Sequence, residues 1–379
     1  MEQNIKNKFT DLAIQMEKDV KYDQYSDSEI INKWTTLFLN MNNEYREGIK
    51  QLSLKELYAD TLSAVINKSE ANILFDAVPT GLKSLDRIIG GLPVSELTVI
   101  GARPAMGKTA FLLTVLANSI VSKNDSIAFF SLENSSQSIM LRLMSIFSNQ
   151  SLYKILTSKQ DELEKKIFIS ATKTIEDANL EIVDDCFTMD DIVSRTNFLV
   201  KEKGVKLIII DYLQLIQTKS KMNREQEIAK NCRELKALAR KYNIAILVSS
   251  QLSRSVETRG GDRRPQLNDL RESGAIEQDA DKVIFLHRPE YYNVTEDEQG
   301  DSTIGMAEFI VAKNRGGAVD SAKVRFVGQF GKFQDLDSTS NFHNYDVLES
   351  FKNIRSNEFL KNFPNKSSET TGMDDTSPF

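Results

Sequence analysis

The sequence predicts an α/β fold in which a mostly parallel sheet is covered by helices on both faces. From about residue 80, short apolar runs alternate with helical patterns, which is typical of parallel strands joined by helical crossovers. The runs are apolar throughout rather than alternating in polarity, which indicates strands that are buried on both faces. The predicted strands are Leu97–Ala102, Ile127–Leu132, Val205–Ile210, Ile244–Val248, Val283–Leu286 and Ala307–Ala312.

The end of this domain has a different pattern. Gly316-Gly317 separates the last of these runs from two further short runs, Lys323–Val327 and Lys332–Leu336. Closely spaced strands with a glycine turn between them predict antiparallel pairing. We therefore expect antiparallel strands at one edge of the sheet.

Helical patterns precede the sheet. Residues 1–52 are predicted as a small helical region, in which Ser26-x-x-Glu29 is a capping box followed by apolar residues at helical spacing. Residues 53–78 are predicted as a further helix, opened by the same signal at Ser53-x-x-Glu56. This helix packs either on its own subunit or on a neighbouring one. The α/β domain then spans 79–337.

Composition limits where the chain acts. No apolar run reaches the ~20 residues that span a bilayer, and the N-terminus lacks an apolar signal core, so we expect a cytoplasmic protein with no membrane partner. Residues 338–379 are polar, and we expect this tail to be partly disordered.

The net charge of −6 argues against a general nucleic-acid coat. A local arginine cluster is either a nucleic-acid contact or a solvated loop: Arg254, Arg259, Arg263, Arg264 and Arg271.

The most informative segment follows the strand Leu97–Ala102. It is a turn rich in Gly and Pro that ends in Gly107-Lys108-Thr109 before an apolar helical pattern, the setting of a nucleotide P-loop. Backbone N–H groups and the helix N-terminus bind phosphates there, Lys108 reaches the β- and γ-phosphates, and Thr109 holds Mg²⁺. The predicted nucleotide-binding residues of this loop are Ala102, Arg103, Pro104, Ala105, Met106, Gly107, Lys108 and Thr109. Ala102 stands where the strict pattern has its first glycine.

Polar residues follow other predicted strands. Asp211 ends the apolar run Leu207–Ile210, as a Walker B acid does, and predicts a second Mg²⁺ ligand. Glu133 follows Ile127–Leu132 at the sheet edge where ligands bind, and is a candidate to orient a water molecule. Gln251 closes another strand and is a candidate to sense the γ-phosphate. Asp184 and Asp185 are weaker alternatives to Glu133, and each of these residues also has a purely structural interpretation.

A basic pair lies at the end of a late strand. Lys313-Asn-Arg315 precedes Gly316-Gly317 and is a candidate for stabilising transition-state charge. An arginine supplied by a neighbouring subunit contributes roughly 10³–10⁵ in rate. The alternative is an exposed arginine in a turn.

Taken together, these motifs resemble the C-terminal motor domain of the DnaB family, the bacterial and phage replicative DNA helicases. The resemblance runs from about Thr80 to Phe333. The motifs that carry it are Thr80-Gly-Leu-x-x-Leu-Asp86, Ala102–Thr109, Phe129-Phe-Ser-Leu-Glu133, Ile210-Asp-Tyr-Leu-Gln-Leu215, Arg224–Ile228, Arg233–Ala239, Ser250–Glu257, Asp269–Asp281 and Lys313–Gly316. This family also has alanine at the position of Ala102.

The resemblance implies a RecA-like P-loop ATPase core in a ring of six subunits, with ATP and Mg²⁺ bound between neighbours. It further implies translocation on single-stranded DNA with 5′ to 3′ polarity. The implied catalytic residues are Lys108, Glu133, Gln251 and Arg315, and the implied metal ligands are Thr109 and Asp211. The implied pair that acts on the neighbour's nucleotide is Lys313 and Arg315. The implied DNA contacts are Arg271, Glu272 and Gly274, and Arg254 of the arginine cluster is added to them.

The N-terminal part departs from the family. Leu54–Asn67 matches the family's linker helix, but the region before it is shorter than the family's helical domain, as in a phage or mobile-element variant. A collar, a primase contact and a helicase loader therefore stay open. Two other functions also stay open: a RecA-like DNA-dependent ATPase of recombination, and a subunit without unwinding activity that modulates a host helicase.

The last residues, Asp374-Asp-Thr-Ser-Pro-Phe379, are similar to the acidic tip of bacterial single-stranded DNA-binding proteins. Phe379 would fill an apolar pocket, and the aspartates would lie on its basic rim. This resemblance predicts docking on replication proteins that bind such tips. The alternative is a tail end with no partner.

Overall fold

The computed structural model describes residues 2–21, 27–46, 54–55, 58–59, 62, 76–122, 125–218, 223–259, 263–270, 274–297 and 299–337. The chain divides into two compact units, Met1–Lys68 and Ser69–Phe379. The predictions for the tail 338–379, and most of those for 53–78, lie outside the described residues.

The first unit contains the helices α1 (Glu2–Lys21) and α2 (Asp27–Arg46). α2 begins directly after Ser26, the predicted capping residue. Lys33 of α2 forms an ion pair with Asp19 of α1 at 2.6 Å, and the Trp34 side chain is buried. In the stretch that follows, Leu54, Tyr58 and Leu62 are exposed and recur at helical spacing.

The second unit is built on one large sheet. Within the described part of 76–337, nine strands pair in the order β11-β10-β9-β8-β3-β7-β6-β4-β5. The six strands from β8 to β5 run parallel, and β9, β10 and β11 add an antiparallel edge, as the sequence predicts. Their bounds are β3 Leu97–Ala102, β4 Ser126–Ser131, β5 Leu180–Val183, β6 Val205–Asp211, β7 Ala245–Gln251, β8 Lys282–His287, β9 Met306–Asn314, β10 Ser321–Val327 and β11 Lys332–Asp335.

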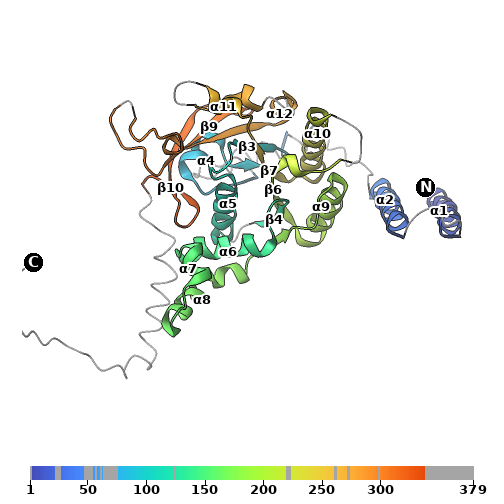
Figure 1. Ribbon diagram of the computed structural model, residues 1–379. Helices are drawn as coiled ribbons and strands as arrows, with labels where there is room; N and C mark the ends of the chain where they lie inside the picture. The colour runs from blue at the N-terminus through green and yellow to red at the C-terminus, as the bar shows by residue number, and fades with distance from the viewer. Residues whose placement is uncertain are drawn as a thin grey trace, which may run out of the picture. The chain divides into compact units, whose positions relative to one another are not determined.

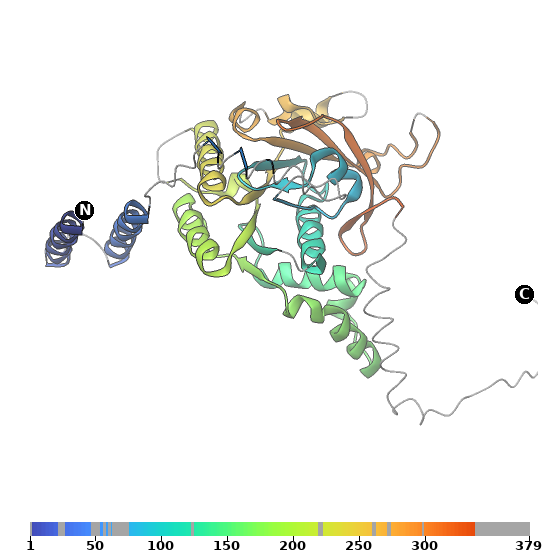
Figure 2. The same ribbon diagram turned by 180° about the vertical axis from the view of Figure 1, so that it is seen from behind.

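Helices connect and cover these strands (Figures 1 and 2). They are α4 Lys83–Ile89, α5 Lys108–Ser122, α6 Ser136–Ser148, α7 Leu152–Thr157, α8 Glu162–Glu176, α9 Met189–Lys203, α10 Arg224–Tyr242, α11 Ser255–Thr258 and α12 Gly274–Asp279. Short 3-10 turns lie at Leu213–Leu215, Leu267–Leu270 and Pro289–Tyr292, and a small two-stranded sheet pairs Ala77–Val78 (β1) with Leu92–Pro93 (β2). Both views show α7 and α8 extending away from the β4 side of the sheet.

The sheet separates two hydrophobic cores. On one face, Ile100 and Leu247 belong to the core that contains α5, whereas their neighbours Val99 and Val248 belong to the core that contains α9 and α10. Successive strand residues point to opposite faces, so a strand between two cores has to be apolar at nearly every position. The unbroken apolar runs of the sequence therefore follow from a three-layer arrangement.

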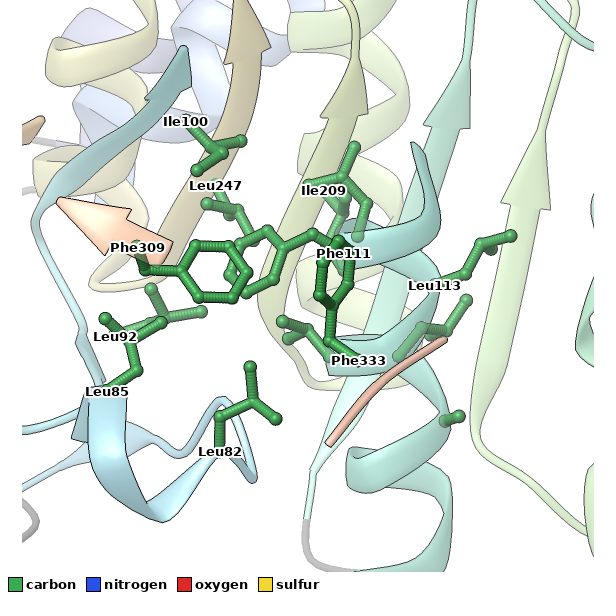
Figure 3. Packing of buried hydrophobic residues seen from close by; sticks show 14 of the residues in the cluster. Leu82, Leu85, Leu92, Ile100, Phe111, Leu113, Ile209, Leu247, Phe309 and Phe333 are labelled. Atoms are coloured by element: carbon green, nitrogen blue, oxygen red, sulfur yellow. The ribbon is translucent and has the colours of Figure 1, made fainter. Parts of the chain in front are cut away.

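Aromatic rings fix α5 against the antiparallel edge. The Phe111 ring of α5 lies 4.6 Å from Phe309 of β9, and Phe309 lies 5.3 Å from Phe333 of β11, measured between centroids (Figure 3). All three side chains are buried. Such pairs contribute about 0.5–1.5 kcal/mol each beyond their burial. This packing holds the first turn of α5, where the predicted nucleotide loop ends.

Within the described residues, no helix combines the length and apolar character that a membrane span requires.

Candidate nucleotide site

The predicted P-loop lies between β3 and α5, at the carboxyl end of the parallel strands. Ala102 is buried at the end of β3, Pro104 and Ala105 are exposed, and α5 starts at Lys108. Gly107 has a φ of 106°, which favours glycine, and a Cβ there would lie 3.1 Å from Cζ of Phe333. The chain therefore turns sharply at Gly107 and presents the N-terminus of a fifteen-residue helix to this edge of the sheet.

Gly101 has a separate role. A Cβ at this position would lie 2.9 Å from Cδ1 of Phe285 and 3.0 Å from Cδ2 of Leu252. Gly101 thus serves close packing inside the sheet, and it does not stand in for the P-loop glycine that Ala102 replaces.

Three charged groups of the predicted site lie near one another. The Lys108 ammonium donates a hydrogen bond to the Ala102 carbonyl at 3.3 Å. Burial lowers the pKa of Lys108, while the carboxylates of Asp211 and Glu133 act in the opposite direction. The structure therefore brings Lys108, Asp211 and Glu133, which come from three segments, to the same end of the sheet.

Asp211 ends β6 with a side chain that is only 1% exposed. Its two oxygens accept hydrogen bonds from the hydroxyls of Thr109 and Ser249, each at 2.6 Å. A hydroxyl beside a buried carboxylate provides oxygen ligands suited to Mg²⁺, which completes its shell with waters and phosphate oxygens. The described residues contain no cluster of three or more His, Cys, Asp or Glu that could bind a metal ion.

Gln251 ends β7, the strand that also carries Ser249. Its backbone is held by Gln214, a residue that the sequence did not single out. The Gln214 amide accepts a hydrogen bond from Gln251 N at 3.2 Å and donates to Gln251 O at 3.3 Å and to Ser250 Oγ at 2.9 Å. The Gln251 side chain is exposed. The only sequence signal for Gln214 is its place three residues after Asp211.

Arg288 was also missed. It follows β8, its guanidinium lies 4.0 Å from the centroid of the Phe326 ring, and it donates to the Ala105 carbonyl at 3.5 Å. It thus lies beside the loop, and it also forms an ion pair with Glu290. Its position directly after a parallel strand is the signal that could have found it.

Arg103 belongs to the loop, but its side chain leaves it. The side chain is buried, and it donates to the Leu252 carbonyl at 2.7 Å and to Glu257 at 2.9 Å. Asp184 likewise has a structural contact, because it accepts a hydrogen bond from Ser136 N at the start of α6 at 2.6 Å.

Lys313 and Arg315 lie away from the P-loop of the same subunit. Asn314 pairs with Lys282 at the start of β8, and Lys282 pairs with Thr98 near the start of β3. The P-loop follows the far end of β3, about 13 Å further along at ~3.3 Å per residue. The nucleotide loop therefore lies at the carboxyl end of the parallel strands, and the basic pair lies at their amino end.

Three members of the arginine cluster make contacts within the subunit. Arg259 forms an ion pair with Asp269 at 2.5 Å, Arg264 with Glu308 at 2.6 Å, and Arg263 lies over the Tyr292 ring. Arg254 is exposed next to α11, and Gly274 is the exposed first residue of α12. Arg271 and Glu272 lie outside the described residues.

Known proteins resemble the chain over this same region. The model of the DnaB-like helicase C terminal domain matches residues 77–335. The replicative DNA helicase DnaB of Geobacillus stearothermophilus is 40% identical over 263 residues, which are 69% of this chain and 57% of that protein. A probable plasmid replicative DNA helicase of Chlamydia psittaci is 40% identical over 261 residues, or 68% and 55% of the two chains. The chain thus spans a little over half the length of these curated relatives.

Solved structures agree with this match. A solved ATPase domain is 33% identical with a TM-score of 0.68, covering 75% of this chain and 99% of that one. A DnaB-like replicative helicase, described with its interactions with primase, is 30% identical with a TM-score of 0.73, covering 89% and 77%. The chain belongs to the DnaB-like helicase C-terminal domain family, whose RecA-like core its sheet and helices reproduce.

Proposed function

We propose that the chain is the motor subunit of a replicative DNA helicase. Six copies would form a ring that hydrolyses ATP, moves 5′ to 3′ along single-stranded DNA and separates the duplex at the fork. The observation that carries this proposal is that the candidate residues lie at two opposite ends of the parallel strands. Lys108, Asp211 and Glu133 lie at the carboxyl end of these strands, and Arg315 lies at their amino end.

In the proposed mechanism, Lys108 and the backbone of the P-loop bind the phosphates of ATP. Thr109 and Asp211 would hold Mg²⁺, and the ion would supply positive charge to balance that of the phosphates. Glu133, exposed at the end of β4, accepts the proton of the water that attacks the γ-phosphorus. The bond from that phosphorus to the bridging oxygen breaks, and ADP leaves.

Lys313 and Arg315 would complete this site from the neighbouring subunit. Their distance from the P-loop of their own subunit supports that assignment. Gln251, whose backbone Gln214 holds beside Asp211, would sense the γ-phosphate and link it to the DNA contacts. Those contacts are Arg254, Arg271, Glu272 and Gly274, and they would bind mainly the DNA backbone, so binding should weaken with salt.

Partners belong to the same proposal. The DnaB-like relative of known structure is described with primase, and we propose a primase and a helicase loader as partners here too, acting in the cytoplasm. A RecA-like ATPase of recombination and a subunit that modulates a host helicase remain the alternatives. The motifs Asp269–Asp281 and Lys313–Gly316 favour the helicase over the first, and the complete set of catalytic side chains favours it over the second.

The proposal is tested by DNA-stimulated ATP hydrolysis and fork unwinding, measured on the wild type and on Lys108→Ala. The wild type should have both activities. Lys108→Ala should lose at least about 10²-fold of both, because the charge on the transferred phosphoryl group is no longer balanced. Lys173→Ala, which removes an exposed lysine of α8, is the matched control and should keep both activities. ATP hydrolysis without unwinding would favour the recombination ATPase, and neither activity would favour the modulating subunit.

We also propose that Asp374–Phe379 docks on replication proteins that bind the tails of single-stranded DNA-binding proteins. The full chain should capture such a protein in a pull-down, and deletion of Pro378–Phe379 should abolish the capture, because the aromatic anchor and its carboxylate are lost. Equal capture by both chains would refute this docking.

A further inference from the structure

Arg315 is held by Asp281 through both its backbone and its side chain. Its backbone N–H donates to the Asp281 carbonyl at 3.0 Å, and its NH1 group donates to Oδ1 of Asp281 at 3.2 Å. Its NH2 group donates to the carbonyl of Gln278 at the end of α12. The guanidinium is thereby fixed at two terminal nitrogens.

Asp281 itself is buried and held by several hydrogen bonds. It is 5% exposed, and its second oxygen, Oδ2, accepts hydrogen bonds from Leu97 N at 2.8 Å and from the Lys236 ammonium at 2.6 Å. Its own N–H donates to the Leu97 carbonyl at 2.9 Å. One carboxylate thus ties Arg315 to the first residue of β3, the strand that leads to the P-loop.

The contacts leave part of Arg315 available. A guanidinium has five N–H groups in a planar fork, so it binds a carboxylate with some of them while others face a second anion. Half of the Arg315 side chain is exposed. The bond to Asp281 therefore orients the group without occupying it.

From this geometry we propose that Asp281 is a positioning residue for Arg315, which holds the guanidinium in the orientation that reaches the nucleotide of the next subunit. The inference rests on the proposed function, in which Arg315 acts on ATP bound by a neighbour. Without Asp281 the arginine would still be present, but it would sample many orientations. A small misplacement of a catalytic group costs up to about 10²-fold in rate.

The test is a double-mutant cycle on the full chain with single-stranded DNA, in which radiolabelled ATP makes very slow hydrolysis measurable. Asp281→Asn should lower kcat about 10–100-fold. The KM for ATP and the affinity for the fluorescent nucleotide mant-ADP should stay within about twofold, because the phosphate-binding loop belongs to the other half of the site. Added to Arg315→Ala, the Asp281→Asn change should cost nothing further, because it acts through the arginine alone.

Controls separate this role from a structural one. Glu308→Gln changes another buried acid that pairs with an arginine and lies in β9, and it should keep the wild-type kcat. Asp281→Glu is the second variant should Asp281→Asn fail to fold, and the same lack of additivity is expected. Losses that add in the double variant, a wild-type kcat in both Asp281 variants, or loss of mant-ADP affinity would overturn the positioning role alone. A wild-type kcat in Arg315→Ala would instead overturn the proposed function of Arg315, and this inference with it.

Discussion

At the scale of single residues, two positions of the candidate site leave little or no room for a side chain. Gly101 and Gly107 both lie against aromatic rings, but for different reasons. Gly107 has a left-handed backbone that a turn requires, whereas Gly101 lies in a strand and gives room to Phe285 and Leu252. Asp211 is surrounded in the same close way, with a hydroxyl on each oxygen.

We predict that Gly101→Ala destabilises the protein by about 1–3 kcal/mol, because the new Cβ would lie within 3.0 Å of two side chains that have to move. Gly316→Ala is the matched control, since a Cβ at that position meets nothing within 4 Å. Urea unfolding of the two variants measures the difference in the free energy of unfolding. Equal midpoints for the two variants would show that the sheet absorbs the extra methyl group without strain.

At the scale of elements, the apolar runs predicted most bounds of the predicted strands within two residues, whereas β7 continues three residues beyond the predicted end at Val248. The interpretation depended on continuous runs such as Leu207–Ile210, which only burial on both faces explains. β5 was not predicted, because Leu180–Val183 has just four residues and includes Glu181 at the sheet edge. Short edge strands carry too little of the apolar signal.

The local sequence pattern does not predict contacts between distant segments. α4 lacks a capping side chain of its own, and Asp335 of β11 accepts the hydrogen bonds of Lys83 N and Ser84 N instead. Likewise, the sequence could not reveal that Asp269 and Glu308 form ion pairs with two members of the arginine cluster. Local patterns fix the type of an element, whereas its charge partners depend on the folded arrangement.

At the scale of the candidate site, the sequence predicted the residues at the P-loop edge because each follows a strand. Gln214 and Arg288 escaped because their contacts are with segments distant in the sequence: Gln214 bonds to Ser250 and Gln251, and Arg288 contacts Ala105 and Phe326. The opposite location of Arg315 required the register of β8 and β9, which no spacing in the sequence encodes.

At the scale of the whole molecule, the separated half-sites predict complementation between inactive subunits. Arg315→Ala and Glu133→Ala should each lose steady-state ATP hydrolysis when assembled alone. Mixed in equal amounts, they should recover activity, because roughly a quarter of the interfaces would pair an intact Glu133 with an intact Arg315 from the neighbour. Steady-state hydrolysis measured across mixing ratios checks this, with mixtures of either variant with itself as the control. No recovery at any ratio would contradict action on the neighbouring site.

β9 runs antiparallel to β8, so Arg315, which follows β9, lies at the opposite end of the parallel strands from the P-loop. Under the proposed function, each subunit has an arginine at one end of the parallel strands and a nucleotide loop at the other, so copies would join head to tail rather than through two identical faces. A row of such copies always leaves one nucleotide loop lacking its arginine and one arginine lacking a loop, however long the row grows. Only closure into a ring would bring these two ends together. Ring closure would therefore complete the last of the proposed sites.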